Sequence, residues 1–170
     1  MELIFPSIEM KQAALDYRQE HFDCGETMIN GDAGLDMAET YESWLEKIRD
    51  DLIRDEGDYV PATVYFGINK GKLIGTIQIR HKLNDHLIKN GGHIGYGVRP
   101  SERRKGHATE MLALALKKCR DLGIDKALIT CDKGNLGSLR TIENNGGIFE
   151  DEFLESDGNI TLRYWISIKK

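Results

Sequence analysis

Apolar residues recur along this chain with two periods, and these divide it into an ordered series of strands and helices. Alternation at every second position predicts strands, and spacing of three or four predicts helices. The turn signal Asn69-Lys70-Gly71 separates two alternating runs and predicts a hairpin. The predicted series is strand 2–6, helix 9–22, helix 40–55, strands 62–68 and 72–80, a helical turn 84–89, strand 93–98, helix 110–122, strand 126–132, helix 136–145, and strands 149–155 and 160–168.

Residues 23–39 form a long stretch without either period, and three glycines fall within it. Long loops in compact domains often act as lids or binding segments. We therefore expect residues of about 20–45, including Tyr41 and Trp44, to form one wall of a binding site. Trp44 also lies on the apolar face of its predicted helix, so core packing is the alternative for that side chain.

A basic turn that contains glycine joins strand 93–98 to the helix after it. A helix N-terminus carries free backbone N–H groups and partial positive charge, and glycine lets a ligand approach the backbone. We predict a phosphate cradle here, with a solvated turn as the alternative. The spacing is neither that of a dinucleotide-binding loop nor that of a P-loop. The turn reads Arg103-Arg104-Lys105-Gly106-His107-Ala108-Thr109.

Two segments together carry a family resemblance. The pattern Arg103-x-x-Gly106-x-Ala108, after a strand that ends in Val98-x-Pro100, resembles motif A of the GNAT superfamily of acyl-CoA-dependent N-acetyltransferases. In the second segment, Asn135, Ser138 and Gly146 match positions that GNAT chains often share. The tyrosine that often follows the asparagine by seven residues is Ile142 here.

This resemblance implies an α/β (α+β) fold of the GNAT type. Its expected architecture is a mixed central sheet of about seven strands with helices on both faces. At 170 residues the chain is long enough to bury a core, and we expect a single domain over residues 1–170.

The resemblance also implies acetyl-CoA as co-substrate. The backbone amides from Arg104 to Thr109 would hold its pyrophosphate. The strand end would pair with the pantetheine arm, and the N–H near Val98 would face the developing oxyanion. The cofactor-binding residues implied are Gly97, Val98, Arg103, Arg104, Lys105, Gly106, His107, Ala108, Thr109, Asn135 and Ser138.

Acetyl transfer to an amine requires the removal of one proton and the delivery of another to the CoA thiolate. His93 has a suitable pKa range, and Tyr96 lies on the same strand, so we predict both as catalytic residues. Strict alternation puts them on opposite faces, and a structural role for His93 stays open. Because Ile142 cannot donate a proton, the acid would be Tyr96, Cys131, Tyr164 or solvent.

We accordingly expect an acetyl-CoA-dependent N-acetyltransferase that acts on the primary amine of a small molecule or peptide. The amine would attack the thioester directly. Two alternatives remain open: a non-catalytic acyl-CoA-binding sensor on the same fold, which Ile142 favours, and a phosphate- or nucleotide-binding regulatory domain.

Charge is unevenly spread along the chain. Residues 1–60 hold 16 acidic and 5 basic side chains, whereas residues 61–170 hold 12 and 18. A basic half suits an anionic cofactor and an acidic half suits a cationic amine, with solvated helix faces as the alternative. The sequence pI of about 5.6 argues against nucleic acid as a partner, and no apolar stretch predicts a membrane span. A homodimer is left open.

Cysteine and histidine spacing gives little sign of a metal site. Cys24, Cys119 and Cys131 are odd in number and widely separated, and the five histidines show no ligand spacing with them. We expect reduced thiols, no metal and a cytoplasmic location. The first residues lack the basic region and apolar core of a signal peptide.

Overall fold

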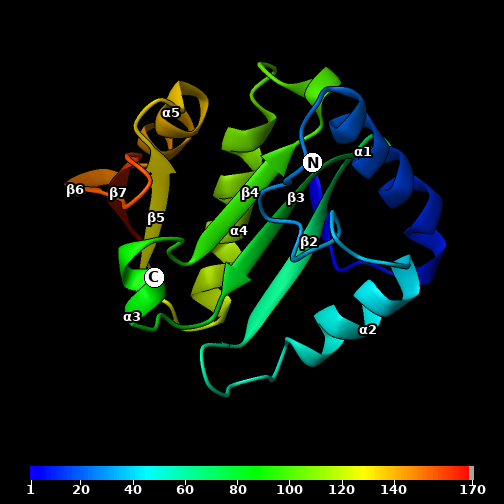
Figure 1. Ribbon diagram of the computed structural model, residues 1–170, viewed down its shortest axis with the longest axis horizontal. Helices are drawn as coiled ribbons and strands as arrows, with labels where there is room; N and C mark the ends of the chain where they lie inside the picture. Colours follow the sequence, from blue (N-terminus) through cyan, green and yellow to red (C-terminus); the bar gives the residue numbers. More distant parts are fainter. Residues whose placement is uncertain (169–170) are drawn as a thin grey trace.

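The computed structural model describes residues 1–168 and contains the predicted series of elements (Figure 1). Short 3₁₀ turns precede the first helix and the helix after the basic turn. The first strand ends before Pro6, which has no N–H to donate to a ladder. The elements are β1 (Glu2–Ile4), α1 (Lys11–Asp23), α2 (Tyr41–Asp50), β2 (Ala62–Asn69), β3 (Lys72–Arg80), α3 (Asp85–Lys89), β4 (Ile94–Val98), α4 (His107–Asp121), β5 (Lys126–Asp132), α5 (Leu136–Asn144), β6 (Ile148–Leu154) and β7 (Ile160–Ser167).

The seven strands form two antiparallel sheets, ordered β1-β2-β3-β4 and β5-β7-β6. The expected single mixed sheet is therefore divided between β4 and β5, which run in the same direction in Figure 1. Just before the start of β4, the His93 N–H donates a hydrogen bond to the Leu128 carbonyl of β5 over 2.7 Å. The Leu128 N–H then donates to the His93 side chain rather than to a backbone carbonyl. The His93 side chain thus replaces the backbone carbonyl that would accept the next hydrogen bond between the strands, and β4 and β5 diverge beyond this point.

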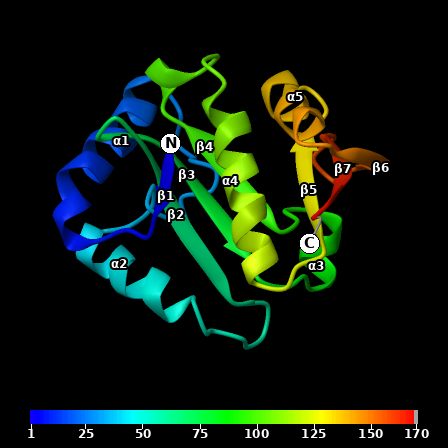
Figure 2. The same cartoon turned by 180° about the vertical axis from the view of Figure 1, so that it is seen from behind.

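Helices cover both faces of the first sheet, as the GNAT-like fold requires. Side chains of α1 and α2 form one apolar cluster with β2, in which Trp44 stacks on Phe66. Helix α4 lies across the back of the sheet (Figure 2) and buries Met111, Leu112 and Ala115 completely. Its cluster continues into β5 and β7, so α4 joins the two sheets. Among residues 1–168, no helix combines the length and the apolar character that crossing a bilayer requires.

Candidate active site

The divergence of β4 and β5 opens a groove of about 1140 Å³. Its walls come from the turn before α4, the free edge of β4, the end of β5, the first turns of α5 and the loop after α1. All the predicted cofactor residues except Lys105 line it. Those residues are Gly97, Val98, Arg103, Arg104, Gly106, His107, Ala108, Thr109, Asn135 and Ser138.

The N-terminus of α4 presents unpaired backbone amides to this groove. No side chain caps the helix at Gly106, and the first helical hydrogen bond runs from the Glu110 N–H to the Gly106 carbonyl. The amides of the preceding residues have no acceptor within the helix, which makes this end suited to an anion. Gly106 has a φ of +82°, and a Cβ there would meet no atom within 4 Å. Backbone conformation, rather than packing, therefore requires the glycine.

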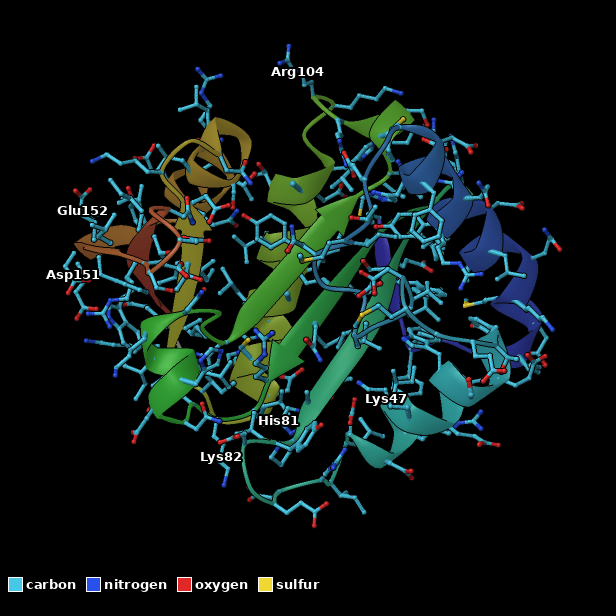
Figure 3. The ribbon with its side chains drawn as sticks, in the orientation of Figure 1. Lys47, His81, Lys82, Arg104, Asp151 and Glu152 are labelled. Carbon is cyan, nitrogen blue, oxygen red and sulfur yellow. The ribbon has the colours of Figure 1, made fainter. Side chains whose placement is uncertain are left out.

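The three basic side chains of the turn are engaged differently. Arg103 forms a two-pronged ion pair with Glu26, at 2.5 and 2.7 Å. Lys105 binds Glu102 at 2.9 Å and stands off the groove. Arg104 extends outward (Figure 3) and has no acidic partner within residues 1–168. The charge predicted for phosphate binding is thus available chiefly on Arg104.

Arg140 is a groove residue that sequence reasoning missed. It lines the groove from α5, and no acidic partner is found for it in the described part of the chain. In the sequence it belongs to the second segment of the family resemblance, two residues after Ser138. That position was the only feature of the sequence that pointed to it, because it does not belong to the motif itself.

The free edge of β4 offers backbone groups beside the cradle. The Arg99 N–H donates to the Ile74 carbonyl in β3 over 2.8 Å. Because amides alternate between the two edges of a strand, the Val98 N–H points to the opposite edge, toward the groove. The Val98 carbonyl on that edge accepts a bond from Arg103 Nε at 3.1 Å. This leaves the Val98 N–H free for a ligand.

Part of the loop after α1 lies flat on β4. A Cβ on Gly97 would come within 2.6 Å of the Asn30 carbonyl, and one on Gly31 within 2.4 Å of the Gly95 carbonyl. Glycine at these positions therefore admits the loop, which contributes Glu26, Met28, Asn30 and Gly31 to the groove. Of the residues from about 20 to 45 that were expected to form one wall of a binding site, only these four, between Glu26 and Gly31, line the groove.

Tyr41 and Trp44 do not belong to that wall. Their exposed fractions are 1% and 2%, and both side chains pack in the apolar cluster of α1 and α2. The Trp44 indole N–H donates to the Asp32 carbonyl at 3.0 Å, so Trp44 supports the loop from below.

Tyr96 brings a phenol to the groove. Its hydroxyl lies 2.7 Å from Ser138 Oγ in the first turn of α5. Burial raises the pKa of Tyr96 to about 12, so the phenol stays protonated at neutral pH. Ile142 lies one turn further along α5 and is fully buried in the core. The only phenol on the groove therefore comes from β4, as far as residues 1–168 are concerned.

Three other predicted residues have mixed outcomes. Asn135 caps α5 by accepting the Ser138 N–H at 3.0 Å, which leaves its amide NH₂ for a ligand. Cys131 lines the groove, and burial raises its pKa to about 11, so the thiol stays protonated at neutral pH and is a second candidate proton donor beside Tyr96. Tyr164 lies away from the groove in the core.

His93 is off the groove, and the expectation that it acts as a general base does not fit its position. It is 7% exposed, and its Nδ1 accepts the Leu128 N–H at 3.0 Å. Burial, together with the nearby Arg80, lowers the pKa of His93 to about 4. An imidazole that is neutral and already hydrogen-bonded through Nδ1 serves here as a structural link between β4 and β5.

We predict that His93→Leu lowers the free energy of unfolding by about 1–3 kcal/mol at pH 7, because the buried Leu128 N–H loses its acceptor. The pKa of His93 is lower in the folded chain than its unfolded value of about 6.5, so its stabilising contribution is lost as pH falls from 6.5 toward 4. The wild type and the variant should therefore converge in stability over that range.

Urea unfolding at several pH values measures this difference. His93→Asn, which can still offer an acceptor oxygen, serves as the control and should lose less. A constant difference between wild type and His93→Leu from pH 7 to pH 4 would contradict the structural role.

Solved structures with the same fold support this architecture. The microcin C7 self-immunity acetyltransferase MccE, in complex with acetyl-CoA and AMP, is 20% identical, with 98% of this chain and 91% of that chain covered and a TM-score of 0.70. RimJ from Mycobacterium smegmatis, in complex with CoA-disulfide, is 19% identical, with 97% and 80% covered and a TM-score of 0.73. A variant of spermidine N-acetyltransferase SpeG from Vibrio cholerae is 16% identical, with 98% and 95% covered and a TM-score of 0.65.

Sequence comparison gives the family. No curated protein sequence matches the chain significantly. The sequence profile described as the acetyltransferase (GNAT) domain matches residues 9–148, which include the basic turn, the free edge of β4 and the first turns of α5. The protein therefore belongs to the GNAT acetyltransferase family.

Proposed function

We propose that the protein is an acetyl-CoA-dependent N-acetyltransferase that acts on the primary amine of a small molecule or peptide. One observation carries the proposal: a single groove combines the uncapped N-terminus of α4, the free N–H of Val98 and the hydroxyl of Tyr96. The solved relatives named above include a spermidine N-acetyltransferase, whose acceptor is an amine.

The groove has suitable places for each part of acetyl-CoA. The amides from Arg104 to Thr109, with the Arg104 guanidinium, would hold the pyrophosphate. The edge of β4 at Gly97 and Val98 would pair with the pantetheine arm, and the amide of Asn135 would contact it from the other wall. Gly106 fits this placement because nothing occupies the space beside its Cα.

Bound acetyl-CoA supplies an activated thioester. The acceptor nitrogen forms a bond to its carbonyl carbon and the carbon–sulfur bond breaks, with the electron pair leaving on sulfur. The Val98 N–H would stabilise the charge that develops on the carbonyl oxygen. The Tyr96 hydroxyl would give its proton to the sulfur, and water would take the proton from the amine, because His93 lies off the groove.

A cationic acceptor fits a carboxylate at the end of β5, which forms one of the walls of the groove. Asp132 lines it and accepts a hydrogen bond from Asn159 at 2.7 Å. In the described ion pairs it has no cationic partner. We therefore include an ammonium-bearing acceptor in the proposal, approaching past Met28 and Asn30.

A CoA-release assay with a panel of polyamines, amino acids and peptides tests the proposal. Turnover with any amine supports it. A rise in melting temperature with acetyl-CoA but no turnover would favour the non-catalytic sensor, and a rise with ATP alone would favour the nucleotide-binding alternative.

The pH profile of the reaction should follow the acceptor. The pKa of His93 is about 4 and that of Tyr96 about 12, so neither group titrates between pH 6 and 9. We predict that kcat/KM rises with pH over this range in step with the free fraction of the amine. Acceptors of different pKa should shift the profile correspondingly. An inflection near pH 7 that is the same for every acceptor would contradict this.

The proposal treats residues 1–170 as one catalytic domain that works in the cytoplasm. A homodimer stays a prediction, which light scattering of the purified protein would check. No group of three or more His, Cys, Asp or Glu side chains is placed to hold a metal ion in residues 1–168.

A further inference from the structure

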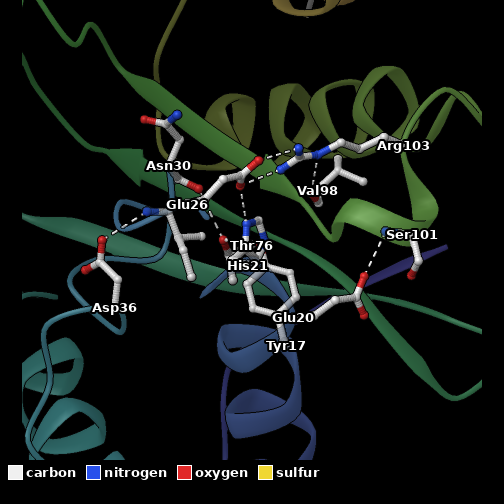
Figure 4. Close-up of polar contacts among 11 residues, drawn as sticks. Tyr17, Glu20, His21, Glu26, Asn30, Asp36, Thr76, Val98, Ser101 and Arg103 are labelled. Carbon is white, nitrogen blue, oxygen red and sulfur yellow. Dashed lines mark hydrogen bonds and ion pairs between the residues drawn. The ribbon is translucent and has the colours of Figure 1, made fainter. Parts of the chain in front are cut away.

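Arg103 ties the turn before α4 to a loop that lies far away in the sequence (Figure 4). Both terminal nitrogens of its guanidinium bind the carboxylate of Glu26, and its Nε binds the carbonyl of Val98 at 3.1 Å. The hydrogen bond from Arg103 lowers the pKa of Glu26 to about 2, so the pair stays charged at neutral pH. A planar fork of this kind fixes orientation as well as distance.

Glu26 is itself held from behind. One of its oxygens lies 2.7 Å from Nδ1 of His21, and its backbone N–H donates to the His21 carbonyl at 3.0 Å. His21 is 2% exposed and packs edge-on against Tyr17, whose hydroxyl lies 3.2 Å from Thr76 in β3. The carboxylate is therefore anchored to α1 and, through Tyr17, to the sheet (Figure 4).

A second carboxylate near the end of α1 holds the other side of the same turn. Glu20 accepts the Ser101 N–H at 2.8 Å and pairs with Arg99 at 3.1 Å. The connection from β4 to α4 is thus fixed at Arg99 and Ser101 by Glu20, and at Arg103 by Glu26. These contacts come from Glu20 in α1 and from Glu26 in the loop after it, and they hold the residues that directly follow Val98, whose N–H faces the groove.

We propose that Glu26 is a positioning residue for the acetyl-CoA site: it holds Arg103 on the Val98 carbonyl and so fixes the strand end and the phosphate cradle. The inference rests on the proposed function, because it concerns the binding of acetyl-CoA in the groove. Glu26 lies on the loop that was expected to form one wall of a binding site, and its contact with Arg103 reaches the turn before α4, where the pyrophosphate would lie. A movement of the loop at Glu26 would therefore also move the turn before α4.

A competing role for Glu26 predicts the opposite change in acetyl-CoA affinity when Glu26 is replaced. If Glu26 only occupied Arg103 until phosphate displaced it, its removal would free a cation for the ligand and tighten binding. In the positioning role, removal lets Arg103 leave Val98 and lets the turn move, so binding weakens. The two roles are separated by the direction in which acetyl-CoA affinity changes.

Calorimetric titration of the full chain with acetyl-CoA tests the proposal. Glu26→Gln should raise the Kd by about tenfold, since it removes one charged partner of a hydrogen-bonded pair. Arg103→Lys keeps the positive charge but loses the fork, so it should weaken binding similarly. The double variant should be no weaker than the weaker single variant, because both changes break one interaction.

Glu42→Gln is the matched control, because Glu42, like Glu26, is an acidic residue in an ion pair, here at 2.6 Å to Lys11, but lies off the groove. It should leave the Kd unchanged even if both Glu→Gln variants lose similar amounts of melting temperature. With an active acceptor, Glu26→Gln should raise the KM for acetyl-CoA and keep kcat.

An unchanged or lower Kd in Glu26→Gln, with wild type binding normally, would overturn the positioning role alone. Failure of the wild type to bind acetyl-CoA would instead overturn the proposed function, and this inference with it. If Glu26→Gln does not fold, the titration of Arg103→Lys decides, since an unchanged Kd there would overturn the proposal.

Discussion

Replacing Gly106 by aspartate should weaken acetyl-CoA binding by roughly 100-fold, because like charges brought together in a binding site cost several kcal/mol. The substitution puts a carboxylate beside the unpaired amides at the start of α4, where the pyrophosphate would lie. A negative charge at a helix N-terminus stabilises the helix, so α4 should stay folded while the ligand is excluded. Nothing lies within 4 Å of the added Cβ, so the substitution causes no clash, but the φ of +82° strains the backbone of any residue other than glycine.

Gly106→Asn is the control for size and for backbone strain. Asparagine tolerates a positive φ better than most residues and has the shape of aspartate without its charge. It should weaken binding much less than aspartate does, and the difference between the two variants reports the charge. Titration with acetyl-CoA measures both. Equal affinities in the aspartate variant and wild type would rule out the cradle at this turn.

The uncapped N-terminus of α4 could be predicted from the sequence because its determinants are local. A glycine that permits a positive φ, a helix that starts directly after it and a strand directly before it all lie within a few residues. The start of α4 lies at His107 rather than at residue 110, because backbone conformation at Gly106 begins the helix before its apolar period becomes visible. Local sequence therefore predicted where amides would be free.

Contacts between distant segments were not predictable in this way. Arg103 and Lys105 were expected to face phosphate, but both form ion pairs with acidic side chains. The partner of Arg103 is Glu26, which lies 77 residues away in sequence. Charge counts indicate how many cations a segment has and not which of them remain unpaired. The division into two sheets has the same origin, since alternation predicts strands but does not say that His93 will replace a backbone partner of Leu128.

Alternation also limited which side chains of the predicted strand 93–98 could lie on one face. It predicted that only one of His93 and Tyr96 could face the acyl group, and the structure has Tyr96 on the groove and His93 off it. The choice between them needed the position of α5, whose Ser138 meets the phenol. The same packing puts Ile142 in the core, which explains why an apolar residue is acceptable there.

Tyr96→Phe should lower kcat by about 100-fold, the lower end of what a general acid contributes, since a thiolate is a tolerable leaving group. The hydroxyl is protonated at neutral pH, because its pKa is about 12, and it lies at the first turn of α5 beside Asn135 and Ser138. Phenylalanine keeps the ring and its packing, so acetyl-CoA affinity should change little. The loss should therefore appear in kcat and not in the KM for acetyl-CoA.

Two further variants separate proton donation from packing. Tyr164→Phe removes a phenol that lies off the groove and should keep full turnover. Ser138→Ala removes the hydroxyl partner but leaves the Tyr96 phenol, so it should cost far less than Tyr96→Phe. Steady-state rates at saturating acetyl-CoA, between pH 6 and 9, compare all three. If Tyr96→Phe retains the wild-type kcat, the proton must come from Cys131 or from solvent, and catalysis would depend more on positioning and on the Val98 N–H.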